Sequence, residues 1–322
     1  MPAFLAQGRM KGHYNYQSGL HPAQCFVFSA SPLLSMLARV ELSIEEIRAA
    51  VKAALAEDIG HGDVTTLATI FESATAHAIM RAREPLVVAG IALAETAFRE
   101  LSAGIQIERL AQDSRRVNGG EALLKISGSA RAILCAERVA LNFVQRLCGV
   151  ATLTAQFVDA IKDTHAQILD TRKTTPGWRR FEKYAVTCGG GSNHRFGLFD
   201  QALIKDNHLA ALKDESPNAV GAAVGRVREK FPKIKIEVEA DTLEQVEQAV
   251  EAGADMVLLD NMNPVQLRLA VQRCKGRALT EASGGVNLAS VLTIAETGVD
   301  FISVGALTHS ARAMDIGLDF EN

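Results

Sequence analysis

The chain has 322 residues, of which 48% are hydrophobic and 22% are charged, so it can bury one large globular core or two ordinary ones. Its formal net charge of −3 argues against a protein that binds nucleic acid through a broad basic surface. No stretch of the sequence is long and apolar enough to predict a membrane-spanning helix.

The five cysteines are scattered along the chain, and none forms a C-x-x-C pair. An odd number without close spacing argues against a disulfide framework and against a structural zinc site. Free thiols are typical of a reducing compartment. We therefore expect a cytoplasmic protein in which most cysteines are small buried residues.

The first 40 residues contain no Asp or Glu. Acid-poor leaders can be targeting peptides, but this one has no clear cleavage site and no Arg-rich helix. We therefore expect residues 1–40 to be a poorly ordered extension of the folded protein.

The folded part is expected to begin at a helix start signal near residue 43. Ser43 precedes Glu46 by three residues, which is the spacing of a capping box. Apolar residues then recur on one helical face at Ile44, Ile47, Val51 and Leu55. The segment therefore predicts an amphipathic helix that packs on a core.

Residues 41–150 are interpreted as an N-terminal α/β domain of the mixed α+β type, because short strands and helices are interspersed. The periodicity predicts strands over residues 76–82 and 86–89 and a helix over 91–101. A longer helix is expected from residue 130 to about 161, with a break or kink at Gly149.

Residues 151–322 show a different pattern, in which short apolar strands alternate with amphipathic helices. Repeated β-then-α units predict parallel strands, and six such units indicate a barrel-like or a doubly wound sheet. The expected helices include residues 242–252, 264–274 and 287–296. The expected strands are residues 168–170, 202–204, 234–238, 256–259, 278–280 and 301–304.

Each expected strand is followed by a polar or glycine-rich cluster, and such strand ends gather at one rim of a β/α barrel. The first two clusters, residues 171–174 and 205–208, are cationic, and Asn193-His194-Arg195 lies between them. The next two strands end in carboxylates, and the last two in glycine-rich turns. This order of charges predicts a site for an anionic substrate, a metal-bound polyphosphate and a terminal phosphate.

At these strand ends the sequence closely resembles the quinolinate phosphoribosyltransferase family. The resemblance covers roughly residues 40 to 320, and the combination of DTRKTTPG, NHR and IKDNH in this order and spacing is its most specific part. The matching blocks are EDIGHGDVTT (57–66), AERVALNFVQRLCGVAT (136–152), DTRKTTPGWR (170–179), GGGSNHRFGLFDQALIKDNH (189–208), IEVEADT (236–242), LLDN (258–261), EASGG (281–285) and VGALTHSARAMDIGLDF (304–320).

The resemblance implies an open α/β barrel of about six parallel strands, preceded by the N-terminal domain, with the chain end possibly returning to that domain. It implies a reaction of quinolinate with phosphoribosyl pyrophosphate, assisted by Mg²⁺. The products would be nicotinate mononucleotide, pyrophosphate and carbon dioxide, on the route to NAD. It also implies a homodimer, possibly within a higher oligomer, whose N-terminal domains make the dimer contacts. Neither a nucleic acid nor a membrane is expected as a partner.

The resemblance also assigns residues to the pyridine substrate. Arg172 and Arg195 suit the two adjacent carboxylates of quinolinate, because a guanidinium grips a carboxylate with two parallel hydrogen bonds. His194 and Lys205 would add donors. Arg138 resembles the arginine that reaches the site of the partner subunit, although its spacing alone favours a solvated helix residue.

Catalysis and metal binding are assigned by the same resemblance to Lys205, Glu239 and Asp260. The two carboxylates would lie near the ribose hydroxyls and Mg²⁺, where negative charge favours an oxocarbenium-like transition state. Glu237 points to the same face of its strand as Glu239. We assign the chemistry to Glu239 because it is nearer the strand end, and we interpret Glu237 as a core or supporting residue.

The phosphate groups would be held by backbone N–H groups and small side chains of the last two turns. Thr171 and Lys173, which follow the first strand, complete the expected set, and Lys173 would face the polyphosphate. The expected cradle of the 5′-phosphate consists of Ser283, Gly284, Gly285, Val304, Gly305 and Ala306.

Three alternatives remain open from the sequence. A related phosphoribosyltransferase could act on another base such as nicotinate, but one carboxylate does not need so many cations. A Schiff-base aldolase could use Lys205, and borohydride trapping with a carbonyl substrate would reveal it. A non-catalytic binding protein would be expected to have lost a site cation or carboxylate, and none is missing.

Overall fold

The computed structural model describes residues 40–321, so the expected extension over residues 1–40 lies outside the described residues except for Val40. The described part begins with α1, Ile44–Ile59. Both halves of the predicted capping box are present between Ser43 and Glu46. Three residues of the predicted face, Ile47, Val51 and Leu55, are buried, whereas Ile44 at the first position of the helix is exposed.

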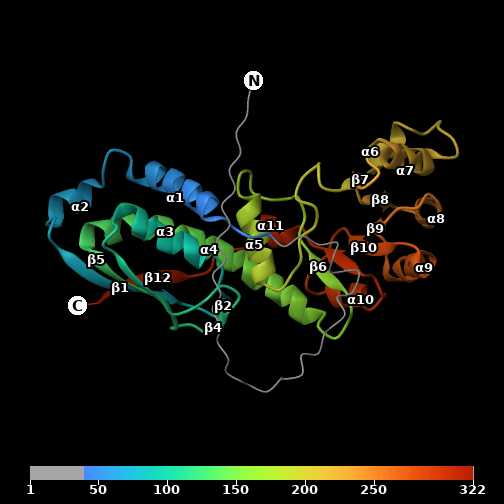
Figure 1. The fold of residues 1–322 in the computed structure, drawn as a ribbon. Helices are drawn as coiled ribbons and strands as arrows, with labels where there is room; N and C mark the ends of the chain where they lie inside the picture. The colour runs from blue at the N-terminus through green and yellow to red at the C-terminus, as the bar shows by residue number, and fades with distance from the viewer. Residues whose placement is uncertain (1–39, 322) are drawn as a thin grey trace, which may run out of the picture. The chain divides into compact units, whose positions relative to one another are not determined.

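An antiparallel sheet forms the centre of the N-terminal part, with the strand order β12-β1-β5-β3 (Figure 1). The strand β12, Ile316–Glu321, comes from the end of the chain and pairs with β1, Thr75–Ala82. The last residues therefore complete the first sheet. The remaining elements of this part are α2 (Val64–Thr69), β2 (Leu86–Val87), α3 (Ile91–Leu101), β3 (Gln106–Arg109), β4 (Arg116–Val117) and β5 (Ala122–Ser129).

The helix α4, Ala130–Ala160, contacts the N-terminal sheet through β1 and β5, and it contacts β6 and α5 of the second part. The predicted break at Gly149 is wrong, because the helix is continuous through this residue. A Cβ atom at Gly149 would lie 1.9 Å from the carbonyl oxygen of Arg312. The close approach of another backbone therefore requires glycine at this position.

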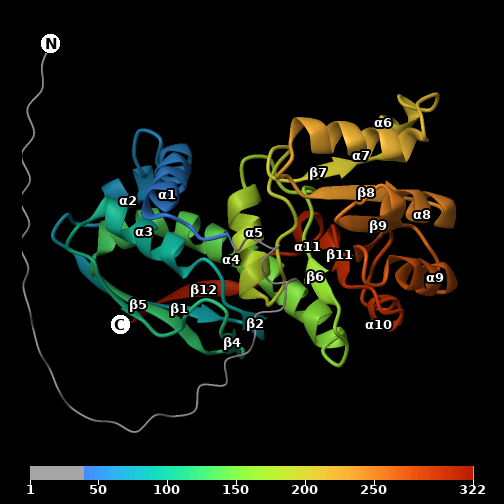
Figure 2. The same cartoon turned by 45° about the vertical axis from the view of Figure 1, so that its right-hand side comes forward.

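The second part contains a parallel sheet of six strands in the order β6-β11-β10-β9-β8-β7 (Figures 1 and 2). All six predicted strands are confirmed, and their bounds differ from prediction by three residues at most. Within the described residues, β6 and β7 are edges that do not pair with each other, as expected for an open barrel. The strands are β6 (Gln167–Leu169), β7 (Ala202–Ile204), β8 (Ile236–Ala240), β9 (Met256–Asp260), β10 (Leu279–Ser283) and β11 (Phe301–Ser303).

The helices of this part follow the strands along the chain, as a repeated β-then-α pattern requires. The predicted helix over residues 287–296 is shorter than expected, because the side chain of Asn287 accepts hydrogen bonds from Ala289 N and Ser290 N and so forms a turn first. No helix of the described residues is long and apolar enough to cross a membrane. The helices are α5 (Arg179–Cys188), α6 (Asp206–Ala210), α7 (Ala219–Lys230), α8 (Leu243–Glu251), α9 (Pro264–Cys274), α10 (Val291–Ala295) and α11 (Ala306–His309).

Replacing Gly149 with alanine tests the contact between α4 and the segment before β12. We expect Gly149→Ala to lower the free energy of unfolding by at least about 1–3 kcal/mol, because the neighbouring backbone must move. The matched control is Gly225→Ala on α7, where a Cβ meets nothing within 4 Å and should stabilise the helix by roughly 0.5–1 kcal/mol. Equal denaturation midpoints for the two variants would contradict the close approach.

Candidate active site

A buried ion pair joins the end of β6 to α5. Asp170 directly follows β6, Lys183 lies on α5, and neither side chain has any solvent exposure. Burial raises the pKa of Asp170 and lowers that of Lys183, while their mutual attraction opposes both shifts. The pair therefore stays charged only while both partners are present.

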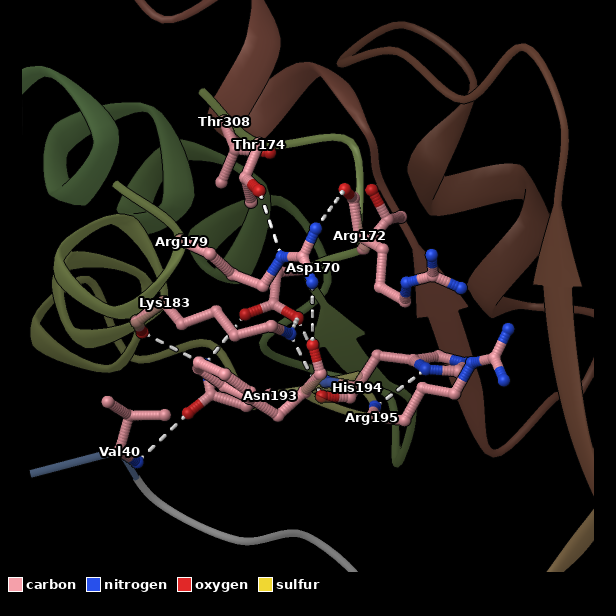
Figure 3. A network of polar contacts seen from close by, with 12 residues as sticks. Val40, Asp170, Arg172, Thr174, Arg179, Lys183, Asn193, His194, Arg195 and Thr308 are labelled. Carbon is pink, nitrogen blue, oxygen red and sulfur yellow. Dashed lines mark hydrogen bonds and ion pairs between the residues drawn. The ribbon is translucent and has the colours of Figure 1, made fainter. Parts of the chain in front are cut away.

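The same two side chains hold the segment that carries the predicted cations (Figure 3). Asp170 accepts hydrogen bonds from His194 N at 2.9 Å and from Asn193 Nδ2 at 2.7 Å. Lys183 Nζ donates to His194 O at 2.9 Å. The backbone of residues 193–194 is thus tied to β6 and α5 from both sides.

Arg179 bonds to the two segments that flank α5 in the chain. Its guanidinium donates to Thr174 Oγ1 at 3.1 Å and to Phe196 O at 3.0 Å, and it also reaches Arg172 O at 3.4 Å (Figure 3). The segments on either side of α5 are therefore linked, and the predicted residues Arg172 and Arg195 lie on these two segments.

Arg172, Arg195 and Lys205 line one cavity of about 440 Å³ beside β7 and α7. Burial, followed by the charge of Arg172, lowers the pKa of Arg195. The Nε atom of Arg172 is buried and has no hydrogen-bond partner among the described residues. Two guanidinium groups that repel each other, one with a free donor, form a site that an anion would stabilise.

Lys205 and Glu239 form an ion pair across the neighbouring ends of β7 and β8. Asp260 ends β9 beside Ser283 of β10, and its carboxylate accepts from Asn261 Nδ2 at 2.7 Å. The predicted carboxylates therefore lie at the ends of adjacent strands.

The predicted phosphate cradle also comes together at the strand ends. Gly284 and Gly285 have positive φ values of 95° and 61°, which glycine adopts without strain. Gly305 begins α11, and a Cβ atom built there would lie 3.1 Å from both Lys173 Cδ and His309 Nε2. Lys173 thus reaches the last turn, although it follows the first strand of the sheet.

His194 makes contacts within the chain at both ring nitrogens. Its Nε2 lies 3.1 Å from Glu237 and 3.3 Å from Glu281, and its Nδ1 accepts from Arg195 N at 2.7 Å. Burial, followed by the charge of Glu281, raises the pKa of Glu237 to about 7. The interpretation of Glu237 as a core residue agrees with its full burial, but it has a polar partner there.

Of the predicted site residues, only Arg172, Arg195 and Lys205 line the cavity beside β7. Arg138 is exposed on α4, and its side chain forms no ion pair with another described residue. Thr171 accepts a hydrogen bond from Lys173 N at 3.0 Å and so shapes the loop after β6. Val304 is buried behind Gly305.

Two adjoining family models together match most of the chain. The model described as quinolinate phosphoribosyl transferase, N-terminal domain, matches residues 63–148, and the model of the C-terminal domain matches residues 150–319. The chain belongs to the quinolinate phosphoribosyltransferase family.

Individual relatives agree with this assignment. Nicotinate-nucleotide pyrophosphorylase [carboxylating] of Mycobacterium leprae is 43% identical over 285 residues, which are 87% of this chain and 99% of that protein. The probable enzyme of the same name from Bacillus subtilis is 42% identical, over 82% of this chain and 89% of that protein. The nicotinate-nucleotide pyrophosphorylase structure from Francisella tularensis has a TM-score of 0.82 and 38% identity, and covers 88% of this chain and 99% of that one.

Two residues of this family member were not assigned a role from its sequence. Lys183 looks like a solvated helix residue until its burial against Asp170 is known, so no local signal could have found it. His309 lies four residues after Gly305, which is helical spacing, and the residues 305–309 could have been interpreted as one turn of helix facing the phosphate cradle.

Removing one partner of the buried pair tests whether it supports the fold. We expect Lys183→Met to lower the free energy of unfolding by about 3–5 kcal/mol, because Asp170 would be left buried without its counter-charge. The control is Arg116→Met, which breaks a well-exposed pair with Asp159 and should cost less than about 1 kcal/mol. Similar losses in urea unfolding for both variants would contradict this role.

Proposed function

We propose that this protein transfers a phosphoribosyl group from phosphoribosyl pyrophosphate to the ring nitrogen of quinolinate, with loss of one carboxylate as carbon dioxide. The products are nicotinate mononucleotide and pyrophosphate, and the reaction belongs to NAD biosynthesis. Membership of the family and the names of its carboxylating relatives support the reaction type. The arrangement of cations in the cavity supports the substrate.

The observation that carries the proposal is the pair of arginines in the cavity beside β7. Arg172 and Arg195 face the same space, together with Lys205, and the buried Nε of Arg172 has no partner within the described chain. Two adjacent carboxylates can satisfy two guanidinium groups at once, whereas the single carboxylate of nicotinate leaves one cation unpaired. The site thus favours a pyridine dicarboxylate.

Glu239 and Asp260 are the proposed catalytic carboxylates. They lie at the ends of β8 and β9, where negative charge can stabilise positive charge that develops on the ribose. Lys205, paired with Glu239, is the cation closest to this group and is proposed to exchange that partner for an anionic substrate.

Mg²⁺ is the proposed cofactor, and the donor set fits it. Oxygen atoms from one or two carboxylates, together with substrate phosphates and water, are the usual environment of protein-bound Mg²⁺. Glu239 and Asp260 offer such oxygens at neighbouring strand ends. When bound, the ion would neutralise charge on the departing pyrophosphate.

The phosphates of the second substrate are proposed to lie against the glycine-rich turns. Backbone N–H groups of such turns bind phosphate oxygens without a side chain in the way. Lys173 reaches this region beside Gly305. Thr171 is a further proposed contact of this substrate. The proposed cradle itself consists of Ser283, Gly284, Gly285, Val304, Gly305 and Ala306.

The working form is proposed to be a homodimer in the cytoplasm. Arg138 supports the dimer, because it is an exposed arginine of α4 outside the cavity of its own chain. Four cysteines of the described residues are free thiols, three of them buried, which supports a reducing compartment.

A product assay tests the substrate assignment directly. With phosphoribosyl pyrophosphate and Mg²⁺, we expect quinolinate to give nicotinate mononucleotide with a kcat/KM at least about 100-fold above that of nicotinate, since nicotinate leaves a buried cation unpaired. Carbon dioxide release should match product formation one to one. Equal or faster turnover of nicotinate would overturn the assignment.

Mixing two inactive variants tests whether Arg138 acts in the partner's site. Arg138→Ala and Lys205→Ala should each be inactive alone. After subunit exchange about half of the dimers are mixed, and each mixed dimer has one intact site of two. Up to about a quarter of the wild-type activity should therefore return.

The exchange itself is checked with differently tagged subunits. If mixed dimers form and no activity returns, Arg138 does not complete the site of the partner subunit. A mixture of Lys205→Ala with Glu239→Ala is the matched control, because both changes damage the same set of residues and no intact site can form.

A further inference from the structure

A buried cluster of two carboxylates and one imidazole lies beneath the cations of the cavity. Glu237 on β8 and Glu281 on β10 are fully buried, and both face His194 Nε2, at 3.1 Å and 3.3 Å. The other ring nitrogen, Nδ1, lies 2.7 Å from Arg195 N, and Nε2 lies between the two carboxylates. The imidazole is held at both nitrogens.

The cluster is not explained by stability. Glu237 Oε1 and both carboxylate oxygens of Glu281 are buried without a hydrogen-bond partner among the described residues. The interior of a β/α barrel is usually filled with branched apolar side chains, and replacing buried charges with such residues is often neutral or stabilising. Buried carboxylate oxygens without partners, in a place usually filled by apolar side chains, indicate a functional role.

Glu237, His194, Arg195 and Gln201 form a closed ring of contacts. His194 Nε2 contacts Glu237, and Arg195 N donates to His194 Nδ1. The guanidinium of Arg195 donates through Nη1 to Gln201 O at 3.1 Å, and Gln201 Nε2 returns to Glu237 at 3.0 Å. Glu237 is therefore linked to Arg195 on two sides, through His194 to its backbone and through Gln201 to its guanidinium.

The charges around Arg195 also connect it to Glu237. Burial, followed by the positive charge of Arg172, lowers the pKa of Arg195, and the negative charges of Glu237 and Asp200 oppose this shift. On the other side of residues 193–194, Asp170 and Lys183 form a separate pair that neutralises itself. Glu237 and Glu281 together thus place negative charge near the two arginines before an anionic substrate arrives.

We propose that Glu237, assisted by Glu281, is a positioning residue that presents Arg195 and His194 to the carboxylates of the pyridine substrate. The inference rests on the proposed function, since it assigns the substrate of that site. It predicts that removing the carboxylate of Glu237 leaves the denaturation midpoint unchanged or raises it, and weakens the binding of a dicarboxylate.

The test measures both quantities on the full chain. The binding probe is benzene-1,2-dicarboxylate, which has the two adjacent carboxylates but no ring nitrogen to react, and benzoate is the single-carboxylate comparison. For Glu237→Leu we expect an unchanged or higher denaturation midpoint and at least a tenfold higher Kd for the dicarboxylate in calorimetry. Glu237→Gln, which keeps the shape, should lie between Glu237→Leu and the wild type in Kd. The KM for phosphoribosyl pyrophosphate should stay within twofold of wild type in Glu237→Gln.

Glu95→Gln is the matched control. Glu95 is also a buried glutamate, but it pairs with Arg109 in the N-terminal part, so its replacement should lower stability and leave dicarboxylate binding unchanged. If Glu237→Leu and Glu237→Gln bind the dicarboxylate like wild type, the positioning role is wrong. If both lose stability and affinity for both substrates together, Glu237 has only a structural role.

Two further outcomes test the proposed function and the alternative that the cluster binds a metal. Wild-type protein that binds neither the dicarboxylate nor quinolinate would overturn the proposed function, and the positioning role with it. One equivalent of a transition metal in the purified protein, lost in Glu237→Gln, would show that His194, Glu237 and Glu281 are metal ligands instead, because their donor atoms lie within 4.8 Å of one another.

Discussion

Lys183 and Asp170 have no solvent exposure, so their charges must be compensated inside the protein. The arrangement that compensates them also builds the site. Asp170 uses its remaining hydrogen-bonding capacity on Asn193 and His194, and Lys183 uses another donor on the His194 carbonyl. Together with the backbone bonds between Ser192 and β6, this pair holds residues 193–195 against the end of β6 and so helps to fix the two arginines of the cavity relative to each other.

The long helix α4 connects the region of the Lys183–Asp170 pair to the N-terminal part. Its Arg146 donates to Glu182 on α5 at 2.6 Å and to Ala311 O at 2.7 Å, while Glu182 accepts from Thr175 N at 3.0 Å. Arg138, two turns earlier on the same helix, is the residue proposed to serve the partner subunit. One rigid helix thus holds the loop after β6 in its own chain and carries the arginine proposed for the other site.

The sequence predicted most of this architecture, because local patterns reflect it. Apolar runs identified the six strands of the parallel sheet, and the charges that follow them identified Arg172, Arg195, Lys205, Glu239 and Asp260 as neighbours at one rim. The capping box at Ser43 predicted the start of α1 correctly, since both of its partners are three residues apart. These features depend on spacing within one segment.

What the sequence did not predict depends on contacts between distant segments. Gly149 is needed because the backbone of Arg312 passes 163 residues later in the chain, and spacing within α4 contains no trace of it. The burial of Lys183 follows from Asp170, and the contact of Glu237 and Glu281 with one imidazole follows from how β8, β10 and residue 194 are brought together. No local pattern distinguishes these charged residues from solvated ones.

The central claim is that the buried Lys183–Asp170 pair helps to hold Arg172 and Arg195 in position for a pyridine dicarboxylate before the substrate binds. A crystal structure of the protein with quinolinate tests it most directly. We predict that the two carboxylates contact Arg172 and Arg195, and that the backbone of residues 193–195 stays in place with its bonds to Asp170 and Lys183 intact. Quinolinate bound elsewhere, or a site in which residues 193–195 leave Asp170 to reach the substrate, would contradict the account.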